Sequence, residues 1–549
     1  MSETIQITII TENETQDGAQ ERRIHVTHDP VMTLMTTLLQ KELISGNFCG
    51  NRGICQRCRV RFLQAAPLPT GPERQAFTPD ELRRGYRLAC MARPRNDCVV
   101  RLELLEAETM EIVTNTSDLI DVSEKDDQMS QAECLIAVDL GTTTIAMQLM
   151  EIRSGRVIDT YCVMNPQRSY GADVLSRIQA AEAGAADSLR EGVWNVLREG
   201  IEKFGKTHWV KGRKEDGAKE RVNTAPYCMC IAGNTTMEHL LMGLSAAGLG
   251  KSPFTPVELG LQKCFLTLSN EAASSKWVVS SNEAAPSNGT GALIPVCLTP
   301  GISAFVGGDI TAGLYALKML PFISTVKREK ASEREAVLLI DLGTNGEMAM
   351  TDGTRMIVTA AAAGPAFEGG PGKAAAGSDM VALTAHLLKE GIIDRTGLMA
   401  DPYFEEGVSL PLADGRKDSC GETSLYLTQK DIRNLQMAKA AVRAGVEILH
   451  RKLGEPFVTQ VYLAGGFGYY LDVDAAVAIG LLPEQLRTCT KAVGNASLAG
   501  AFQMGKDLWT GKLTEEALAE MMRGIESINL AEQEAFEALY IRYMNLESS

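Results

Sequence analysis

The chain has no apolar run long enough to span a membrane, and its polar start does not have the pattern of a signal peptide. It has no excess of positive charge: the formal net charge is −15 at pH 7, which disfavours nucleic acid as a partner. Neither G-x-x-x-x-G-K-[ST] nor a strand–G-x-G-x-x-G–helix unit occurs, so P-loop and Rossmann sites are excluded. Because a chain of 549 residues with 13 cysteines is too long for a small disulfide-built scaffold, we expect a cytoplasmic protein of about three domains.

One segment concentrates acidic charge. Residues 106–133, EAETMEIVTNTSDLIDVSEKDDQMSQAE, contain one lysine, nine acidic residues and no aromatic residue. Such a composition buries too little apolar surface to form a core of its own. We predict a mobile or loosely docked acidic linker here, between a first domain at residues 1–105 and a larger unit that begins at residue 134.

Four cysteines near the start have the spacing of a [2Fe–2S] cluster site, C-x5-C-x2-C-x31-C, formed by Cys49, Cys55, Cys58 and Cys90. Gly50 and Gly53 lie between the first ligands, where glycine lets backbone N–H groups approach the sulfides and tune the potential. A zinc site usually combines two short C-x2-C knuckles, whereas this part of the chain has one. We interpret Cys98, which lies outside the pattern, as a bystander.

The segments around the cysteines predict a small β-rich domain. TIQITII and RRIHVT alternate apolar and polar residues on either side of a polar turn, which is typical of a hairpin. VMTLMTTLLQKEL has helical periodicity, and CVVRLELL predicts a closing strand. Residues 1–105 resemble the β-grasp fold of [2Fe–2S] ferredoxins, and the first cysteine gap resembles that of the vertebrate-type members.

Basic residues surround the predicted cluster. Residues 1–105 carry 14 basic and 12 acidic residues, and nine arginines flank the ligands: Arg52, Arg57, Arg59, Arg61, Arg83, Arg84, Arg87, Arg93 and Arg95. They either steer an acidic redox partner or form an ordinary solvated face that offsets the charge of the cluster.

The rest of the chain contains one turn twice, about 200 residues apart. LIAVDLGTTTIAMQLMEI and VLLIDLGTNGEMAM each consist of an apolar strand, the sequence D-L-G-T and a second strand. Backbone N–H groups and threonine hydroxyls in such a turn can cradle phosphate oxygens. The aspartates that end the first strands, Asp139 and Asp341, can hold Mg²⁺ through its water ligands.

Three further segments complete a nucleotide-site pattern. VYLAGGFGYYL is an apolar strand that runs into glycines, where an adenosine can lie against the backbone. AVGNASLAGAFQM and FVGGDITAGLYALKML predict small-residue helices suited to close packing, the second starting near Asp309. In YCMCIAGNTT we interpret Cys228 and Cys230 as core thiols. Asn234, Thr235 and Thr236 open a helix, and they either only cap it or have a phosphate or hinge role.

The order of these segments resembles the acetate and sugar kinase, Hsp70 and actin superfamily over residues 134–505. The corresponding motifs are phosphate 1 (139–144), connect 1 (309–317), phosphate 2 (341–347), adenosine (465–468) and connect 2 (494–501). The resemblance implies two ribonuclease H-like α/β lobes with ATP and Mg²⁺ between them and the connect helices crossing at the hinge. The first lobe would span 134–330 and the second 331–549.

The resemblance also implies the site residues. The expected nucleotide contacts are Gly141, Thr142, Thr143, Thr144, Asn234, Gly343, Thr344, Asn345, Gly465, Gly466 and Gly468. The expected catalytic acids are Asp139 and Asp341 for Mg²⁺, with Asp309 or Glu347 to orient the attacking water. The sequence leaves the choice between these last two open.

A ferredoxin domain, an acidic linker and this ATPase together resemble the reductive activators of corrinoid proteins in methyltransferase and O-demethylase systems. CIAGNTTMEHLLMG and AAAGPAFEGGPG are similar to segments of that family. The resemblance implies an ATP-hydrolysing reductase that transfers one electron from the cluster to cob(II) on a corrinoid protein, and so regenerates cob(I) for methyl transfer. It further implies a low-potential electron donor and a homodimer, which the residues themselves do not indicate.

Three alternatives remain open. Activators of 2-hydroxyacyl-CoA dehydratases share the ATPase fold but lack an N-terminal ferredoxin domain. A redox-sensing protein could use the state of the cluster to gate ATP-dependent, chaperone-like binding. A small-molecule kinase with an added ferredoxin domain is the third, although no sugar or acyl site is evident.

Overall fold

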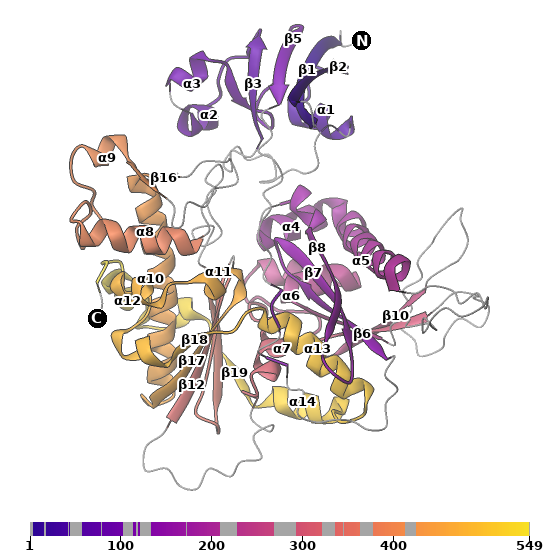
Figure 1. Ribbon diagram of the computed structural model, residues 1–549, viewed down its shortest axis with the longest axis vertical. Coiled ribbons are helices and arrows are strands. Elements are labelled where there is room, and N and C mark those ends of the chain that lie inside the picture. Colours follow the sequence, from indigo (N-terminus) through magenta and orange to yellow (C-terminus); the bar gives the residue numbers. More distant parts are fainter. Residues whose placement is uncertain are drawn as a thin grey trace.

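Figure 1 shows the computed structural model, with a small domain above two larger lobes in this view. The structure describes residues 4–15, 18–41, 43, 58–77, 79–102, 114–116, 119–120, 133–171, 173–208, 228–267, 293–320, 335–343, 345–362, 377–411 and 424–547. Three of the predicted site residues lie outside these ranges, namely Cys49, Cys55 and Thr344. No helix within the described residues is both long and apolar enough to cross a bilayer.

The first domain is a five-stranded sheet in the order β2-β1-β5-β3-β4. Strand β1 pairs antiparallel with β2 and parallel with β5, and β3 pairs antiparallel with β5 and β4. The predicted hairpin, helix and closing strand are all present, and the closing strand β5 lies at the centre of the sheet. The elements are β1 (Ile5–Thr15), β2 (Gly18–His28), α1 (Leu34–Gln40), β3 (Arg59–Gln64), α2 (Gly71–Ala76), α3 (Pro79–Arg83), β4 (Tyr86–Leu88) and β5 (Cys98–Leu102).

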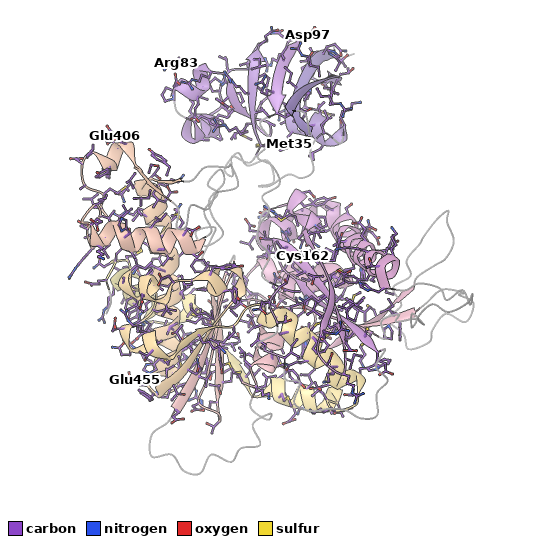
Figure 2. All side chains as sticks on the ribbon, in the orientation of Figure 1. Met35, Arg83, Asp97, Cys162, Glu406 and Glu455 are labelled. Carbon is purple, nitrogen blue, oxygen red and sulfur yellow. The ribbon has the colours of Figure 1, made fainter. Side chains whose placement is uncertain are left out.

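Helix α1 starts against the turn that carries Cys90. The Thr33 hydroxyl caps the helix by accepting the Thr36 N–H. The N–H groups of Leu34 and Met35, which have no partner within a helix, donate to carbonyls of the cysteine turn, Ala92 and Ala89, both at 2.9 Å. Figure 2 shows Met35 and Asp97 at opposite edges of the domain, so the Cys90 turn lies at the Met35 edge.

Lobe I is built on a six-stranded sheet in the order β10-β11-β9-β6-β7-β8. Its strands are β6 (Cys134–Leu140), β7 (Thr144–Glu151), β8 (Val157–Met164), β9 (Cys228–Gly233), β10 (Gln262–Thr267) and β11 (Leu293–Leu298). Its helices are α4 (Val174–Ala180), α5 (Ala186–His208) and α6 (Thr235–Met242), and α7 (Gly308–Ala316) follows β11.

Lobe II has a second six-stranded sheet in the order β18-β17-β12-β13-β14-β19. Its strands are β12 (Glu335–Leu342), β13 (Gly346–Thr351), β14 (Met356–Ala361), β17 (Phe457–Ala464), β18 (Thr490–Ala492) and β19 (Ile525–Ser527), with a small hairpin of β15 (Val408–Pro411) and β16 (Ser424–Leu427). The helices are α8 (Gly377–Lys389), α9 (Tyr403–Glu406), α10 (Gln429–Lys452), α11 (Gly465–Tyr470), α12 (Val473–Ala478), α13 (Ala496–Trp509), α14 (Glu515–Arg523) and α15 (Phe536–Arg542).

The two lobes repeat one topology. In each, three consecutive strands form an antiparallel meander, β6-β7-β8 and β12-β13-β14. Later strands then add parallel to the first strand, β9 and β11 in lobe I and β17 and β18 in lobe II. As a result, the carboxyl ends of β6 and β12, where Asp139 and Asp341 lie, occupy equivalent places in the two sheets.

The two connect helices are exchanged between the lobes. Helix α7 follows the last strand of lobe I, yet Ile310 and Leu314 share a core with Leu339 of lobe II. Helix α13 follows β18 of lobe II, yet Leu498 shares a core with Leu135 of lobe I. Each lobe is therefore covered by a helix that arrives from the other, which ties the angle between the lobes to these two helices.

The helices cross where both are built from small residues. A Cβ at Gly500 of α13 would lie 1.8 Å from the carbonyl oxygen of Ala312 of α7, so only glycine permits this approach. On the same pair of helices the Tyr315 hydroxyl donates to the Asp507 carboxylate at 2.5 Å. The predicted small-residue helices and their crossing are thus present.

Candidate functional site

Four acidic residues from both lobes converge at the start of α7. Asp139 and Asp341 are the next-to-last residues of β6 and β12, and Glu347 on β13 pairs with Asp341 across the antiparallel ladder. Asp309 is the second residue of α7. Charge interactions connect Asp309 with each of the other three, so the structure brings the predicted acids together.

The acids raise one another's pKa. Loss of hydration is the main cause and raises the pKa of both Asp309 and Asp341 to about 7, with a further increase from the charge of Asp139. Loss of hydration, followed by the charges of Asp309 and Asp341, raises the pKa of Glu347 well above its usual value. Carboxylate oxygens are the ligands that Mg²⁺ prefers, usually with several of its waters retained, so this donor set fits a magnesium–nucleotide complex.

Asp139 is held by the connect helix of lobe II. The Asn495 amide donates to one of its carboxylate oxygens at 2.8 Å and the Ser497 hydroxyl to the other at 2.9 Å. Burial raises the pKa of Asp139, and these two hydrogen bonds partly lower it. Asn495 also caps α13 through the Leu498 N–H at 2.7 Å. We call Asn495 and Ser497 the Asp139 clamp; neither was evident from the sequence, because N-capping alone explains an Asn at this position.

Two side chains anchor backbone carbonyl groups of the phosphate 1 turn on one side of it. The Asn165 amide donates to the Gly141 carbonyl at 2.8 Å, and the buried Arg177 guanidinium donates to the Thr142 carbonyl. Because the C=O and N–H of a trans peptide point in opposite directions, the N–H groups of Thr142 and Thr143 are directed away from these anchors. Arg177, on α4, was not evident from the sequence.

Asn234 caps a helix, which is one of the roles that the sequence left open, and it also contacts the phosphate 1 turn. Its side-chain oxygen caps α6 by accepting the Met237 N–H at 3.0 Å. Its amide donates to the Thr142 hydroxyl at 2.8 Å. Asn234 therefore connects the start of α6 to the phosphate 1 turn. Thr144 is the first residue of β7, directly after this turn.

The adenosine and phosphate 2 segments are in contact. Gly465 begins α11 with φ +81°, and a Cβ there would lie 2.4 Å from Asp341 Oδ1. Gly466 faces open space, and Gly468 is in ordinary contact with Leu463. In the phosphate 2 turn the Gly343 N–H donates to the Asn345 carbonyl at 2.9 Å, and the Asn345 side chain hydrogen-bonds with Glu347.

A fifth acid, Glu238, joins the group from α6. It is 9% exposed and accepts the Gly233 N–H at 3.2 Å. Burial and the charge of Asp309 raise its pKa well above the usual value. A Cβ on Gly308 would lie 2.4 Å from its carboxylate, which places it directly behind Asp309. Glu238 was not evident from the sequence, because an acid in the first turn of a helix is an ordinary favourable charge.

In the ferredoxin domain, two of the four predicted ligands are described. Cys58 Sγ and Cys90 Sγ lie 3.2 Å apart in the buried core. This separation exceeds the ~2.05 Å of a disulfide bond, so the two sulfurs are buried neighbours that are not covalently joined. The third and fourth ligands of the predicted pattern therefore fit a [2Fe–2S] cluster.

A buried carboxylate fixes the Cys90 segment. Glu73 is 0% exposed and accepts the Thr70 N–H at 2.7 Å and the Leu88 N–H at 2.9 Å. The next residue, Ala89, donates its N–H to the Cys58 carbonyl at 2.8 Å. Through these bonds Glu73 positions the backbone on which both described ligands depend.

Two further expectations are settled by burial. Arg87 is 5% exposed and donates to the carbonyls of Pro67, Leu82 and Tyr86, so it is not part of a docking face, contrary to its inclusion among the nine arginines. Cys228 and Cys230 are buried, and burial raises the pKa of Cys228, as expected for core thiols.

Three family models match successive parts of the chain. Residues 134–321 match a family model described as the RACo middle region, and residues 335–374 and 371–549 match the C-terminal domain of RACo, the ASKHA domain. Residues 18–95 match a 2Fe-2S iron-sulfur cluster binding domain. These matches confirm the predicted fold class, the predicted [2Fe–2S] cluster, and ATP with Mg²⁺ as the cofactors.

The curated relatives include two with corrinoid functions. The corrinoid activation enzyme RamQ of Eubacterium limosum is 30% identical over 421 residues, 67% of this chain and 63% of the relative. The chain thus spans less than two thirds of that relative's length. The [Co(II) methylated amine-specific corrinoid protein] reductase of Methanosarcina barkeri is 23% identical over 453 residues, 74% of this chain and 76% of the relative.

One solved structure resembles the whole chain. It is titled a reductive activator for corrinoid, iron-sulfur protein, with a TM-score of 0.57 and 23% sequence identity. The alignment covers 99% of this chain and 98% of the other. At this identity the similarity establishes the common fold, with a ferredoxin domain followed by the two-lobed ATPase.

Proposed function

The chain belongs to the RACo family, and from this premise we propose that it is an ATP-dependent reductive activator of a corrinoid protein. When bound to this chain, a reduced [2Fe–2S] cluster would supply the one electron that converts cob(II) on the partner to cob(I), and would itself be left oxidised. The observation that carries the proposal is the presence, in one chain, of the Cys58–Cys90 pair and of five acids gathered between two ATPase lobes.

In this proposal, Cys49, Cys55, Cys58 and Cys90 hold the cluster, which supplies one electron at a time. Asp139 and Asp341 orient the hydrated Mg²⁺, and the N–H groups of Thr142 and Thr143 contact phosphate oxygens. Thr144, Gly343, Thr344 and Asn345 complete the phosphate contacts, while Gly465, Gly466 and Gly468 hold the nucleoside. Asn234 acts through Thr142, to which it donates.

Asp309 is the better candidate for orienting the attacking water. It interacts with the acids of both lobes, whereas Glu347 interacts with Asp309 and Asp341. In hydrolysis the water oxygen forms a bond to the γ-phosphorus, the bond to the ADP oxygen breaks, and a carboxylate accepts the proton of the water. A carboxyl group with a pKa of about 7 is suited to accept and release that proton near neutral pH.

The need for ATP follows from the reduction potentials of the cluster and of the cobalt. Plant-type [2Fe–2S] clusters have potentials near roughly −400 mV, and cob(I) is a stronger reductant still. Each ~59 mV of uphill gap makes a one-electron transfer tenfold less favourable, about 1.4 kcal/mol. ATP can help only by favouring a state in which transfer is easier. Closure of the lobes on ATP would change how the corrinoid protein is held, and hydrolysis would release it.

The proposed partners are a corrinoid protein, a low-potential donor to the cluster and a second copy of the chain. The proposed location is the cytoplasm. Of the described arginines near the cluster ligands, Arg83, Arg84, Arg93 and Arg95 are exposed. Arg83, the last residue of α3, and Arg84, which follows it, pair with Asp80. They are candidates for steering an acidic redox partner.

The test is direct. The protein with its cluster reduced is mixed with a cob(II) corrinoid protein from a methyltransferase system, with and without Mg-ATP, and cob(I) is followed by absorbance. We expect cob(I) to form faster and further with Mg-ATP. Absence of ATP-dependent cob(I) with every cognate partner would exclude the activator function. Under the same conditions, a phosphorylated small molecule would instead indicate a kinase, and release of a bound client protein a chaperone.

A further inference from the structure

The described part of the acidic linker is not loose. Thr114–Thr116 and residues 119–120 run across the place where the two lobes and the connect helix α13 meet, and we call these residues the hinge strap. Thr116 is 2% exposed, and Leu119 and Ile120 pack against two different cores, one associated with each lobe. A segment of this composition needs specific contacts to be ordered.

The strap contacts lobe I through one buried glutamine. The Gln148 amide on β7 donates to the Thr114 carbonyl at 2.8 Å, and the Thr116 hydroxyl donates to the Gln148 side-chain oxygen at 3.3 Å. Gln148 is 2% exposed. A buried amide whose donor and acceptor are both used by the strap specifies one register of the strap on this lobe.

The strap contacts the connect helix through Asn115 and Leu119. The Asn495 N–H donates to the Asn115 carbonyl at 3.1 Å, and the Gln503 amide on α13 donates to the Leu119 carbonyl at 2.6 Å. A Cβ on Gly494 would lie 2.4 Å from the Asn115 carbonyl oxygen, and Gly494 has φ +69°, so glycine is required for this approach. Asn495 is the residue whose side chain clamps Asp139.

The strap contacts lobe II through the adenosine helix. The Asn115 side-chain amide donates to the Tyr469 hydroxyl on α11 at 3.2 Å. Helix α11 begins at Gly465, which lies against Asp341. Asn115 therefore touches, with its carbonyl and its side chain, the two elements that reach the aspartates of phosphate 1 and phosphate 2.

We propose that the hinge strap couples nucleotide occupancy to the tether of the ferredoxin domain, with Asn115 as the positioning residue. Opening or closing of the lobes moves Gln148 of lobe I relative to α11 of lobe II, so the strap cannot keep both its Gln148 bonds and the Asn115–Tyr469 bond unchanged. The strap is joined to the ferredoxin domain by the chain between residues 102 and 114, and the nucleotide state thus alters where the reduced domain can reach. The inference rests on the proposed function for its purpose, but its physical content is independent of any corrinoid protein.

The test is hydrogen–deuterium exchange of the full-length protein with its cluster, without nucleotide and with Mg²⁺ plus a non-hydrolysable ATP analogue. The reporters are peptides that contain the Leu119 and Asn495 amides, both of which are hydrogen-bonded in the strap region. We expect the analogue to change exchange there at least fivefold in the unmodified protein. Tyr469→Phe and Asn115→Ala, which delete the same bond from its two sides, should reduce this change while melting temperature and analogue binding persist.

Tyr540→Phe, on α15 of the same lobe, is the matched control and should behave as the unmodified protein. Unchanged strap exchange with bound analogue overturns the strap proposal alone. The same result for Tyr469→Phe, Asn115→Ala and Tyr540→Phe overturns the role of Asn115. Failure of the unmodified protein to bind the analogue overturns both this proposal and the ATP-dependent function, whereas a lack of cob(I) formation bears only on the latter.

Discussion

The ferredoxin domain and the ATPase each bury acidic side chains, but the electrostatic surroundings of these side chains are opposite. In the ferredoxin domain, Glu73 accepts three hydrogen bonds from Thr70 and Leu88. Burial lowers the pKa of its neighbour Arg87, and the opposite charge of Glu73 partly offsets this decrease. Between the ATPase lobes, Asp309 and Asp341 are surrounded by other acids, and their pKa values are raised to about 7.

The difference distinguishes a buried carboxylate that stabilises the fold from buried carboxylates that form a ligand site. A buried carboxylate that is satisfied by its own chain stabilises one backbone arrangement, here that of the Cys90 segment. A group of acids that raise one another's pKa is unfavourable until a cation arrives. The first arrangement builds a site, and the second is a site that requires its ligand.

Removal of a cluster ligand should have the largest effect. Cys58→Ser is expected to abolish the cluster and all cob(I) formation, because one of two sulfurs 3.2 Å apart is lost, while ATP hydrolysis continues. Cys98→Ser is the control in the same core, since Cys98 is buried and lies outside the ligand pattern. Iron content and the absorbance of the cluster measure the effect. A Cys58→Ser protein that still reduces cob(II) would remove the cluster from the mechanism.

Asp309→Asn should impair ATP hydrolysis between the two lobes. We expect kcat for ATP hydrolysis to fall about 10²- to 10⁴-fold, as for loss of a general base, while the cluster and the fold are retained. Asp474→Asn is the control, because Asp474 is an exposed partner of Arg487 on lobe II. Steady-state phosphate release checks both variants. If Asp309→Asn hydrolyses ATP normally and Glu347→Gln does not, Glu347 is the acid that orients the water.

Glu73→Gln should damage the fold and spare the chemistry. Loss of charge-assisted bonds to a buried group is expected to cost about 1.5–3 kcal/mol of ferredoxin-domain stability. The measurement is urea unfolding followed by the absorbance of the cluster, with ATP hydrolysis as the internal control. Unchanged unfolding of the domain would contradict the role assigned to Glu73.

The smallest effect concerns pH in the absence of cation and nucleotide. The pKa of Asp341 is raised from 3.8 to about 7 in the folded chain. Its stabilising contribution is therefore complete below about pH 4 and is lost as pH rises through 7. We expect the melting temperature in EDTA to fall between pH 6 and 8, by the equivalent of about 1–2 kcal/mol. The decrease should be smaller in Asp341→Asn and after addition of Mg-ATP; an equal decrease in all three would contradict the account.

The sequence was sufficient where chemistry leaves a local pattern. From the four-cysteine spacing, the two D-L-G-T turns and the GGFG segment we predicted the domains. The same motifs identified Asp139, Asp309, Asp341 and Glu347 as candidate site residues. These patterns are readable because a turn, a ligand or a close helix crossing restricts which residues fit. The exchange of α7 and α13 between lobes was not evident, since packing partners far apart in sequence leave no local signal.

The site residues that were not predicted contact the motifs from segments far away in the sequence. Arg177 and Glu238 lie in helices and Asn495 caps one, and a charged or capping residue at such a position has an ordinary explanation. The described part of the linker shows the same limit: its acidic composition predicted weak docking, whereas Asn115 and Thr116 make specific hydrogen bonds. Only the tertiary structure distinguishes such a contact from a solvated side chain.

A single-turnover experiment tests the central claim most directly, namely that the acids between the lobes control electron delivery by the cysteine site. The cluster is reduced, excess donor is removed, and the cluster signal and cob(I) absorbance are followed together after mixing with a cob(II) corrinoid protein. We predict one cob(I) per cluster oxidised with Mg-ATP, and a cluster that stays reduced without ATP or in Asp309→Asn. Equal rates of cob(I) formation with and without Mg-ATP would contradict it.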